Sequence, residues 1–316
     1  MYTPINIVMY HYVRPIAKSL YPNLKGLELD SFRRQLDYLC NKYNIISTDD
    51  LIHVVKNKSS LPANPCLLTF DDGYKDHFTY VFPELQLRKV KGCFFPSAKP
   101  IIKRKVLDVN KIHFILSAQN NISILIADLK FLISKYRKEY NNNNEPLMDF
   151  NWYCKNYSFI ENYDSREVIF FKRMLQYVLP LKVRKKILNV LFQRYVFNDE
   201  QVFASQLYMS IDNIKEMIAN GMCFGGHGYD HEWLNKISDQ TQIEEIDRSI
   251  QFLSKMGIST KDWIMSYPYG GYNKKTLEIL RSRNCFFGFT IESKPAVIQA
   301  GSLLELGRFD TNVFTK

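Results

Sequence analysis

Short apolar strands alternate with amphipathic helices near the start of the chain, and this alternation restricts the fold most. Ile5–Tyr10, Pro65–Phe70 and Lys91–Pro96 are apolar runs that predict buried strands. Between the first two, Asp30–Asn41 and Ser47–Lys56 follow helical spacing. Because parallel strands need crossover connections, usually helices, this order predicts a parallel α/β fold.

The same alternation returns near the end of the chain. Met222–Phe224 and Trp263–Ser266 predict strands, whereas Thr241–Met256 and Lys274–Arg283 predict helices. Polar residues follow the predicted strands directly, at the strand ends where barrels of parallel strands carry their active sites.

The middle of the chain lacks clear strand signals. Helical patterns dominate it, and the tract Asn141–Asn144 indicates a loop. We therefore expect one α/β domain over 1–98 and 209–316, with a mainly helical insertion over 99–208.

Composition narrows the class of protein. A hydrophobic content of 46% and a charged content of 23% are typical of a globular chain. The net charge of +10 is scattered, so we expect no nucleic-acid partner, and peripheral contact with an anionic membrane face stays open. The N-terminus shows no signal-peptide pattern and the six cysteines form no Cys-x-x-Cys pair, which predicts a cytoplasmic protein.

The first chemical motif is Thr69-Phe70-Asp71-Asp72-Gly73, at the end of a predicted strand. Adjacent carboxylates repel each other, and one pKa rises unless a cation intervenes. A metal could bind one carboxylate and leave the other as a base. A solvated turn is the alternative, since Asp-Gly is common in turns.

The second motif is His227-Gly228-Tyr229-Asp230-His231. Two histidines four residues apart on one helical turn would share a face and reach one ion. Imidazole suits zinc, and also cobalt, nickel or iron. An Asp-His-His set leaves open positions on the ion, as a hydrolytic metal needs.

Together these motifs, with Ser266-Tyr267-Pro268-Tyr269-Gly270 as a third, resemble the polysaccharide deacetylase (NodB-homology) family, carbohydrate esterase family four. The resemblance implies an irregular, TIM-like (β/α)7 barrel. It implies that Asp71 is the general base and that Asp72, His227 and His231 hold a divalent transition metal. The backbone N–H of Tyr269 would help to bind the oxyanion.

Two departures from the family pattern point to its circularly permuted branch, which includes poly-N-acetylglucosamine deacetylases. Ser266 stands where an arginine usually orients the base, and no histidine follows His231 to act as the acid. His11, at the end of the first predicted strand, is the candidate acid, and Arg308 is the candidate replacement for the arginine. The alternatives are that His11 is a structural histidine held by a hydrogen bond at the strand end and that Arg308 is an ordinary surface arginine.

The sequence thus predicts a metal-dependent hydrolase that removes an N-acetyl group from an amino sugar or a glycan precursor. A deformylase or other amidase on the same scaffold stays an alternative, as does a non-catalytic carbohydrate-binding protein. The sequence leaves the oligomeric state open.

Overall fold

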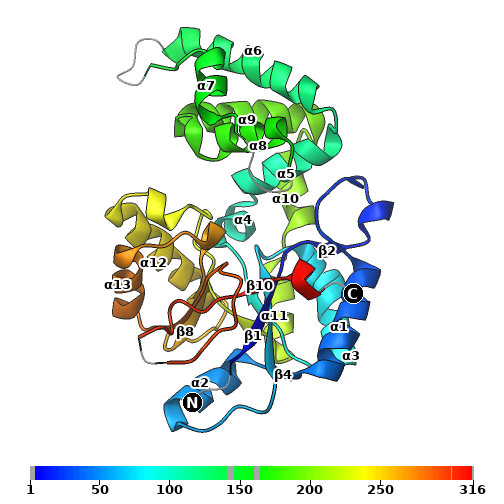
Figure 1. Ribbon diagram of the computed structural model, residues 1–316, viewed down its shortest axis with the longest axis vertical. Helices are drawn as coiled ribbons and strands as arrows, with labels where there is room; N and C mark the ends of the chain where they lie inside the picture. The colour runs from blue at the N-terminus through cyan, green and yellow to red at the C-terminus, as the bar shows by residue number, and fades with distance from the viewer. Residues whose placement is uncertain (1–3, 141–145, 160–163, 300, 315–316) are drawn as a thin grey trace. The chain divides into compact units, whose positions relative to one another are not determined.

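The computed structural model describes residues 4–140, 146–159, 164–299 and 301–314. Its main sheet is parallel, with the order β10-β1-β5-β6-β7 and with β4 paired to β5 (Figure 1). The chain is therefore a mixed α/β protein with a parallel sheet, as the sequence predicts. The strands of this sheet are β1 (Asn6–Tyr10), β4 (Asn44–Ile46), β5 (Pro65–Asp71), β6 (Cys93–Phe95), β7 (Cys223–Phe224) and β10 (Phe309–Asp310).

Strand β5, in the middle of this sheet, explains why the first motif is buried. All seven of its residues are buried, so both faces of the strand are covered. On one side Val8 of β1 lies opposite Leu68 and Tyr10 opposite Phe70, while on the other side Asp71 lies opposite Phe95 of β6. The first motif therefore begins inside a fully buried strand and ends at its carboxyl end.

Helices cover this sheet and bury apolar stripes against it. Helix α1 (Leu29–Lys42) buries Phe32, Leu36 and Leu39, the face that the sequence pattern predicts. A capping box, in which Ser47 and Asp50 bond each other's backbone, starts α2. The helices and helical turns of this part of the chain are α2 (Thr48–Asn57), η2 (His77–Val81), α3 (Phe82–Leu87), α4 (Ala98–Lys103), α10 (Glu200–Leu207), α11 (Ile211–Ala219), η4 (Leu234–Lys236), α12 (Asp239–Lys255), η5 (Pro268–Gly270), α13 (Lys274–Ser282) and η6 (Thr311–Phe314).

Two shorter ladders accompany the main sheet. β2 (Val13–Arg14) pairs with β3 (Leu27–Glu28), and β8 (Trp263–Ser266) pairs with β9 (Cys285–Phe289), all parallel. Isolated parallel bridges add Gly226 beside Met265 and Phe289 beside Leu306.

The chain divides into two compact units. One comprises Met1–Pro15, Gly26–Lys105 and Ala204–Lys316, and the other comprises Ile16–Lys25 and Val106–Phe203. The short segment Ile16–Lys25 thus packs with the second unit, a grouping that no periodicity in the sequence indicates. The division into a catalytic domain and an insertion with separate roles stays a prediction.

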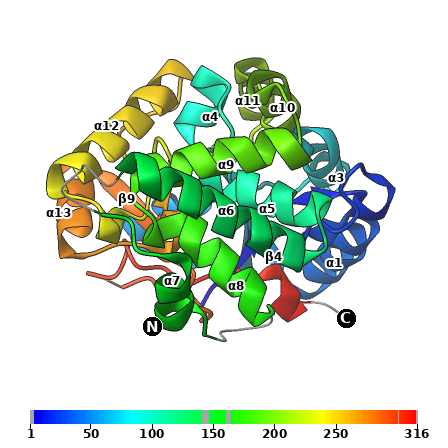
Figure 2. The same ribbon diagram turned by 90° about the horizontal axis from the view of Figure 1, so that it is seen from above.

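The second unit contains helices only, as far as its described residues go. Helices α5 and α9 pack against each other, as do α6 and α8, and Figure 2 shows α9, α6 and α5 lying side by side. The elements are η1 (Ile16–Lys18), α5 (Asp108–Ala118), α6 (Ile122–Tyr140), α7 (Phe150–Tyr157), α8 (Arg166–Arg173), η3 (Met174–Val178) and α9 (Leu181–Tyr195). The loop predicted at Asn141–Asn144 lies outside the described residues, and no helix in the described part combines the length and hydropathy of a membrane span.

Candidate active site

The carboxyl end of β5 turns sharply and separates the two aspartates. Asp72 and Gly73 both have a φ of 71°, in the left-handed region that favours glycine. A Cβ on Gly73 would lie 2.5 Å from the Cβ of Pro96, so the position has no room for a side chain. The turn leaves Asp71 and Asp72 buried and gives them different partners.

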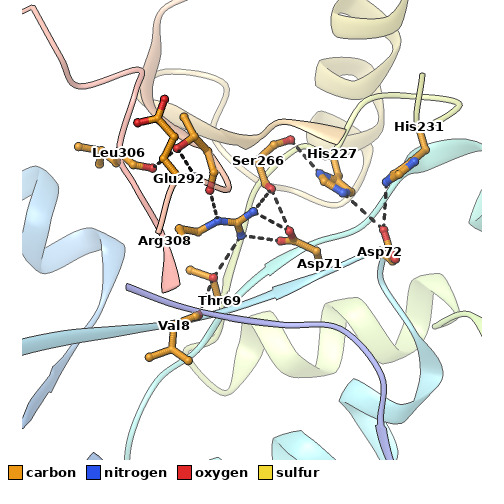
Figure 3. A network of polar contacts seen from close by, with 11 residues as sticks. Val8, Thr69, Asp71, Asp72, His227, His231, Ser266, Glu292, Leu306 and Arg308 are labelled. Carbon is orange, nitrogen blue, oxygen red and sulfur yellow. Dashed lines mark hydrogen bonds and ion pairs between the residues drawn. The ribbon is translucent and has the colours of Figure 1, made fainter. Parts of the chain in front are cut away.

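Asp71 forms a bidentate ion pair with Arg308. Arg308 Nη1 donates to Asp71 Oδ1 at 2.9 Å, and Nη2 donates to Oδ2 at 2.7 Å (Figure 3). The guanidinium also donates to the hydroxyls of Thr69 and Ser266 and to the carbonyl of Thr290. Arg308 is fully buried, which excludes the alternative of a surface arginine.

The same surroundings set the charge of Asp71. Burial alone would raise the pKa of Asp71, but the charges of Arg308 and His227 outweigh burial and lower it to about 2. Ser266, which stands where the family has an arginine, donates its hydroxyl to Asp71 Oδ2 at 3.1 Å. Arg308, far from Asp71 in the sequence, therefore offsets the repulsion between the two adjacent carboxylates.

Asp72 lies against both histidines of the second motif. Its Oδ1 is 3.4 Å from His227 Nε2 and 3.3 Å from His231 Nε2, and the three side chains are buried (Figure 3). One ligand atom from each residue lies within 4.8 Å of the others, which suits a shared ion. Asp72 Oδ1 has no hydrogen-bond partner among the described residues, and a buried carboxylate oxygen left this way is what a cation would satisfy.

A hydrogen bond of His227 determines which of its ring nitrogens carries the proton. His227 Nδ1 lies 2.8 Å from the carbonyl of Ser266, and because a carbonyl only accepts, Nδ1 donates. The lone pair then lies on Nε2, which faces Asp72. Burial would raise the pKa of Asp72, but the adjacent imidazole rings of His227 and His231 outweigh burial and hold the pKa of the carboxyl well below its usual range.

Residues 180–285 match the polysaccharide deacetylase family model, a stretch that contains the second and third motifs. YxkH of Bacillus subtilis (strain 168), by name a polysaccharide deacetylase, is 31% identical over 85 residues, which is 27% of this chain and 30% of that protein. The chain thus spans less than a third of this relative's length.

Solved structures extend the similarity to nearly the whole chain. The Streptococcus pyogenes deacetylase PplD, solved in complex with acetate, superposes over 98% of this chain and 93% of its own, with a TM-score of 0.60 and 18% identity. IcaB from Ammonifex degensii covers 97% and 91%, with a TM-score of 0.56 and 20% identity. The resemblance to NodB-type polysaccharide deacetylases is confirmed.

The second motif has a different local structure from the predicted one. The expectation that His227 and His231 lie on one helical turn is wrong, because Gly228 and His231 have φ of 69° and 58° and residues 227–231 form a loop. The loop brings the two rings to 4.8 Å between centroids.

Glu245 on α12 holds this loop, and the sequence analysis missed it. Its carboxylate accepts the backbone N–H groups of Tyr229 and Asp230 at 3.0 and 2.9 Å. Burial raises the pKa of Glu245 to about 7, because those hydrogen bonds only partly compensate. In the sequence, Glu245 is one of several polar residues of an amphipathic helix, and its distance from the second motif along the chain does not indicate a contact.

Tyr74 is a second residue whose part in the site the sequence did not reveal. Its hydroxyl donates to Asp72 Oδ2, while its ring stacks on Tyr12 with centroids 4.1 Å apart. Tyr74 is fully buried, so its ring cannot stack on a substrate. It lies one residue after the first motif, and this adjacency is the only signal that could have indicated the contact.

His11 and Tyr269 approach the site from two other strand ends. His11 follows β1, the strand that pairs with β5, which carries Asp71. Its carbonyl accepts from Nε2 of the buried His77 at 2.9 Å, and burial lowers the pKa of His77 to about 4. The ring of Tyr269 packs on His231 at 4.6 Å and stacks on Trp233 at 4.4 Å.

Proposed function

We propose that the chain is a metal-dependent N-deacetylase that acts on an amino sugar in a glycan or glycan precursor. The observation that carries this proposal is the buried Asp71–Arg308 pair beside the Asp72, His227 and His231 cluster. The pair keeps one carboxylate ionised, and the cluster offers one oxygen and two nitrogens to a cation.

Asp72, His227 and His231 would hold a divalent transition metal, with zinc preferred and cobalt, nickel or iron also suited. When bound, such an ion acidifies water and polarises an amide carbonyl. Tyr74 orients Asp72 from the opposite oxygen, and the Ser266 carbonyl orients His227. Such outer contacts fix the direction of the ligand atoms.

The remaining roles are assigned to groups of the chain itself. Asp71 accepts the proton of the attacking water, and Arg308 holds its carboxylate in place. His11 donates a proton to the leaving amine. The backbone N–H of Tyr269 donates to the oxygen that becomes negative in the transition state.

We also propose that the strands close into an irregular (β/α)7 barrel of the circularly permuted type. The main sheet runs from β10 to β7, and the bridge of Gly226 with Met265 continues it to β8 and β9. The bridge of Phe289 with Leu306 leads back towards β10. This circuit contains seven strands, β10, β1, β5, β6, β7, β8 and β9, and it supports the proposal.

The substrate proposal rests on the charge of the chain. A net charge of +10 suits a diphosphate-bearing precursor in surface glycan synthesis, met in the cytoplasm or at the inner membrane face. Acetate release from a diphosphate-linked N-acetyl sugar should exceed release from the matching neutral oligosaccharide. Faster turnover of the neutral oligosaccharide would contradict this choice of substrate.

Elemental analysis of the purified protein tests the metal. We expect about one transition-metal ion per chain, lost in the double variant His227→Ala/His231→Ala. His53→Ala is the matched control, because His53 is exposed on α2 and lies outside the cluster. The proposal fails if the wild type holds no ion after incubation with zinc or cobalt, or if His53→Ala loses it equally.

Two alternatives are separated by activity. Competition among formyl, acetyl and longer N-acyl sugars distinguishes a deformylase or another amidase from a deacetylase. Asp71→Asn should abolish turnover while metal binding stays largely intact. A non-catalytic carbohydrate-binding protein would bind sugar but show no turnover in the wild type.

A further inference from the structure

A cavity of about 220 Å³ lies within the helical unit, and none of the residues assigned to catalysis above lines it. It is lined by the segment around Asn23 and Lys25, by the end of α5 with the residues that follow it, and by α8 with the residue before its cap. Sites for drug-sized ligands start at about 300 Å³, so this cavity suits a molecule no larger than one sugar ring.

The lining combines an apolar surface with amide groups. Leu116, Ile122 and Val168 supply the apolar part, and the side chains of Asn23 and Asn120 supply amides. A pyranose ring has the same division, with C–H groups on its faces and hydroxyls at its edge. A small site with an apolar surface and a few placed polar groups is what such a ring requires.

Ser117 adds a polar group that the fold leaves unsatisfied. Ser117 lines the cavity and is 4% exposed. Its Oγ has no hydrogen-bond partner among the described residues, although Asn23 Nδ2 donates to its backbone carbonyl at 3.4 Å. A buried hydroxyl without a partner costs free energy, and a ligand hydroxyl in the cavity would remove that cost.

The charged lining residues leave one positive charge in excess. Lys25 and Lys172 both pair with the carboxylate of Asp164, with the Lys172 Nζ at 2.6 Å from Oδ2. An ammonium group has three donors, so each lysine keeps donors for a further oxygen. Two lysines against one aspartate favour a ligand that carries one negative group.

We propose that this cavity binds a single acidic sugar residue, a pyranose that bears one carboxylate or one phosphate. The negative group lies by Lys25 and Lys172, the hydroxyls bond Ser117 and the amides, and a ring face packs on Leu116, Ile122 and Val168. The cavity shares no lining residue with the proposed active site, and its ligand need not be the substrate.

Isothermal titration calorimetry on the full chain tests this site without any activity assay. The probes are D-glucuronate and glucose 6-phosphate, with D-glucose and inorganic phosphate as comparisons. At least one acidic sugar should bind at least about tenfold more tightly than either comparison, and the tighter of the two identifies the carboxylate or the phosphate as the group recognised. Binding should weaken as the salt concentration rises.

Variants show whether the probe occupies this cavity. Lys172→Met should weaken binding about tenfold, whereas Lys155→Met, which removes an exposed lysine on α7 outside the lining, should leave it unchanged. Ser117→Ala removes only the hydroxyl and should weaken binding several-fold even if Lys172→Met fails to fold.

Three results would overturn the inference. They are the absence of heat with both acidic sugars, equal binding of glucose or inorganic phosphate, and equal loss in Lys172→Met and Lys155→Met. A failure of acetate release would leave this titration unaffected, because none of the catalytic residues lines the cavity.

Discussion

Replacing Arg308 with methionine should destabilise the protein mainly by leaving Asp71 without its counter-ion. The carboxylate is 1% exposed and receives two charged hydrogen bonds from the guanidinium. Removing one member of a buried ion pair costs about 3–5 kcal/mol, because the remaining charge is uncompensated. We expect Arg308→Met to lower the free energy of unfolding by that amount at neutral pH.

The pKa of Asp71 gives an independent magnitude. Its shift from 3.8 to about 2, despite burial, means that the folded protein favours the ionised carboxyl by about 2 kcal/mol. Arg308 is the largest favourable cause of this shift, so its loss should reverse the shift and raise the pKa of Asp71 above its ordinary value. The carboxyl would then bind a proton more readily at neutral pH.

A double-mutant cycle measures the pair itself. Urea unfolding of the wild type, Asp71→Asn, Arg308→Met and the double variant gives four free energies of unfolding. We expect the double variant to be more stable than the sum of the single losses by about 2 kcal/mol or more. Additive losses, within about 0.5 kcal/mol, would refute the argument that these charges depend on each other. Near-ultraviolet circular dichroism of each variant checks that the folded state is retained.

Three further changes test the contacts around the site. Tyr74→Phe should weaken metal binding at least about tenfold in a chelator competition without changing the fold, and unchanged affinity would refute the orienting role. Glu245→Gln should flatten the pH dependence of the free energy of unfolding. Because the pKa of Glu245 is raised in the folded protein, the wild type should lose about 3 kcal/mol of that free energy as the pH rises from 4.5 to about 7. A variant with the same pH dependence in urea unfolding would contradict this. Gly73→Ala should lower the free energy of unfolding by at least about 1 kcal/mol more than Gly257→Ala does, as measured by thermal unfolding. Both glycines have a positive φ, but only at Gly73 would the added Cβ clash with Pro96. Equal losses in the two variants would exclude the clash.

The positions of the motif residues could be predicted because each follows a strand that the sequence marks clearly. β5 is a continuous apolar run, and the carboxyl ends of parallel strands meet at one edge of a sheet. Asp71 and Asp72 therefore had to lie close to whatever follows the neighbouring strands. The backbone between the histidines was less predictable, because a spacing of four residues fits both a helix and a compact loop. Gly228 inside the motif, and the glycine pair before it, were the available signals against a helix.

Contacts made by side chains of covering helices could not be predicted from one sequence. Glu245 is one charged residue among several on α12, and its burial depends on where the loop of the second motif passes. The same holds for Ile16–Lys25, whose packing with the helical unit follows from tertiary contacts and leaves no periodic pattern. Local sequence patterns determine the helices and strands, whereas these contacts depend on how segments far apart in the sequence pack together.

The position of β1 explains how the two departures from the family pattern can be compensated together. β1 lies between β10 and β5, with Val8 opposite both Phe309 and Leu68. His11 follows β1 and Arg308 immediately precedes β10, so the two ends of the chain meet beside the strand that carries Asp71. The guanidinium of Arg308 lies beside the Ser266 hydroxyl, with Nη2 at 2.9 Å from Oγ. A second buried arginine at position 266 would place two cations against the single carboxylate of Asp71. Arg308 thus supplies the positive charge that an arginine at position 266 would otherwise supply. Asp71 therefore stays paired although the third motif carries a serine there.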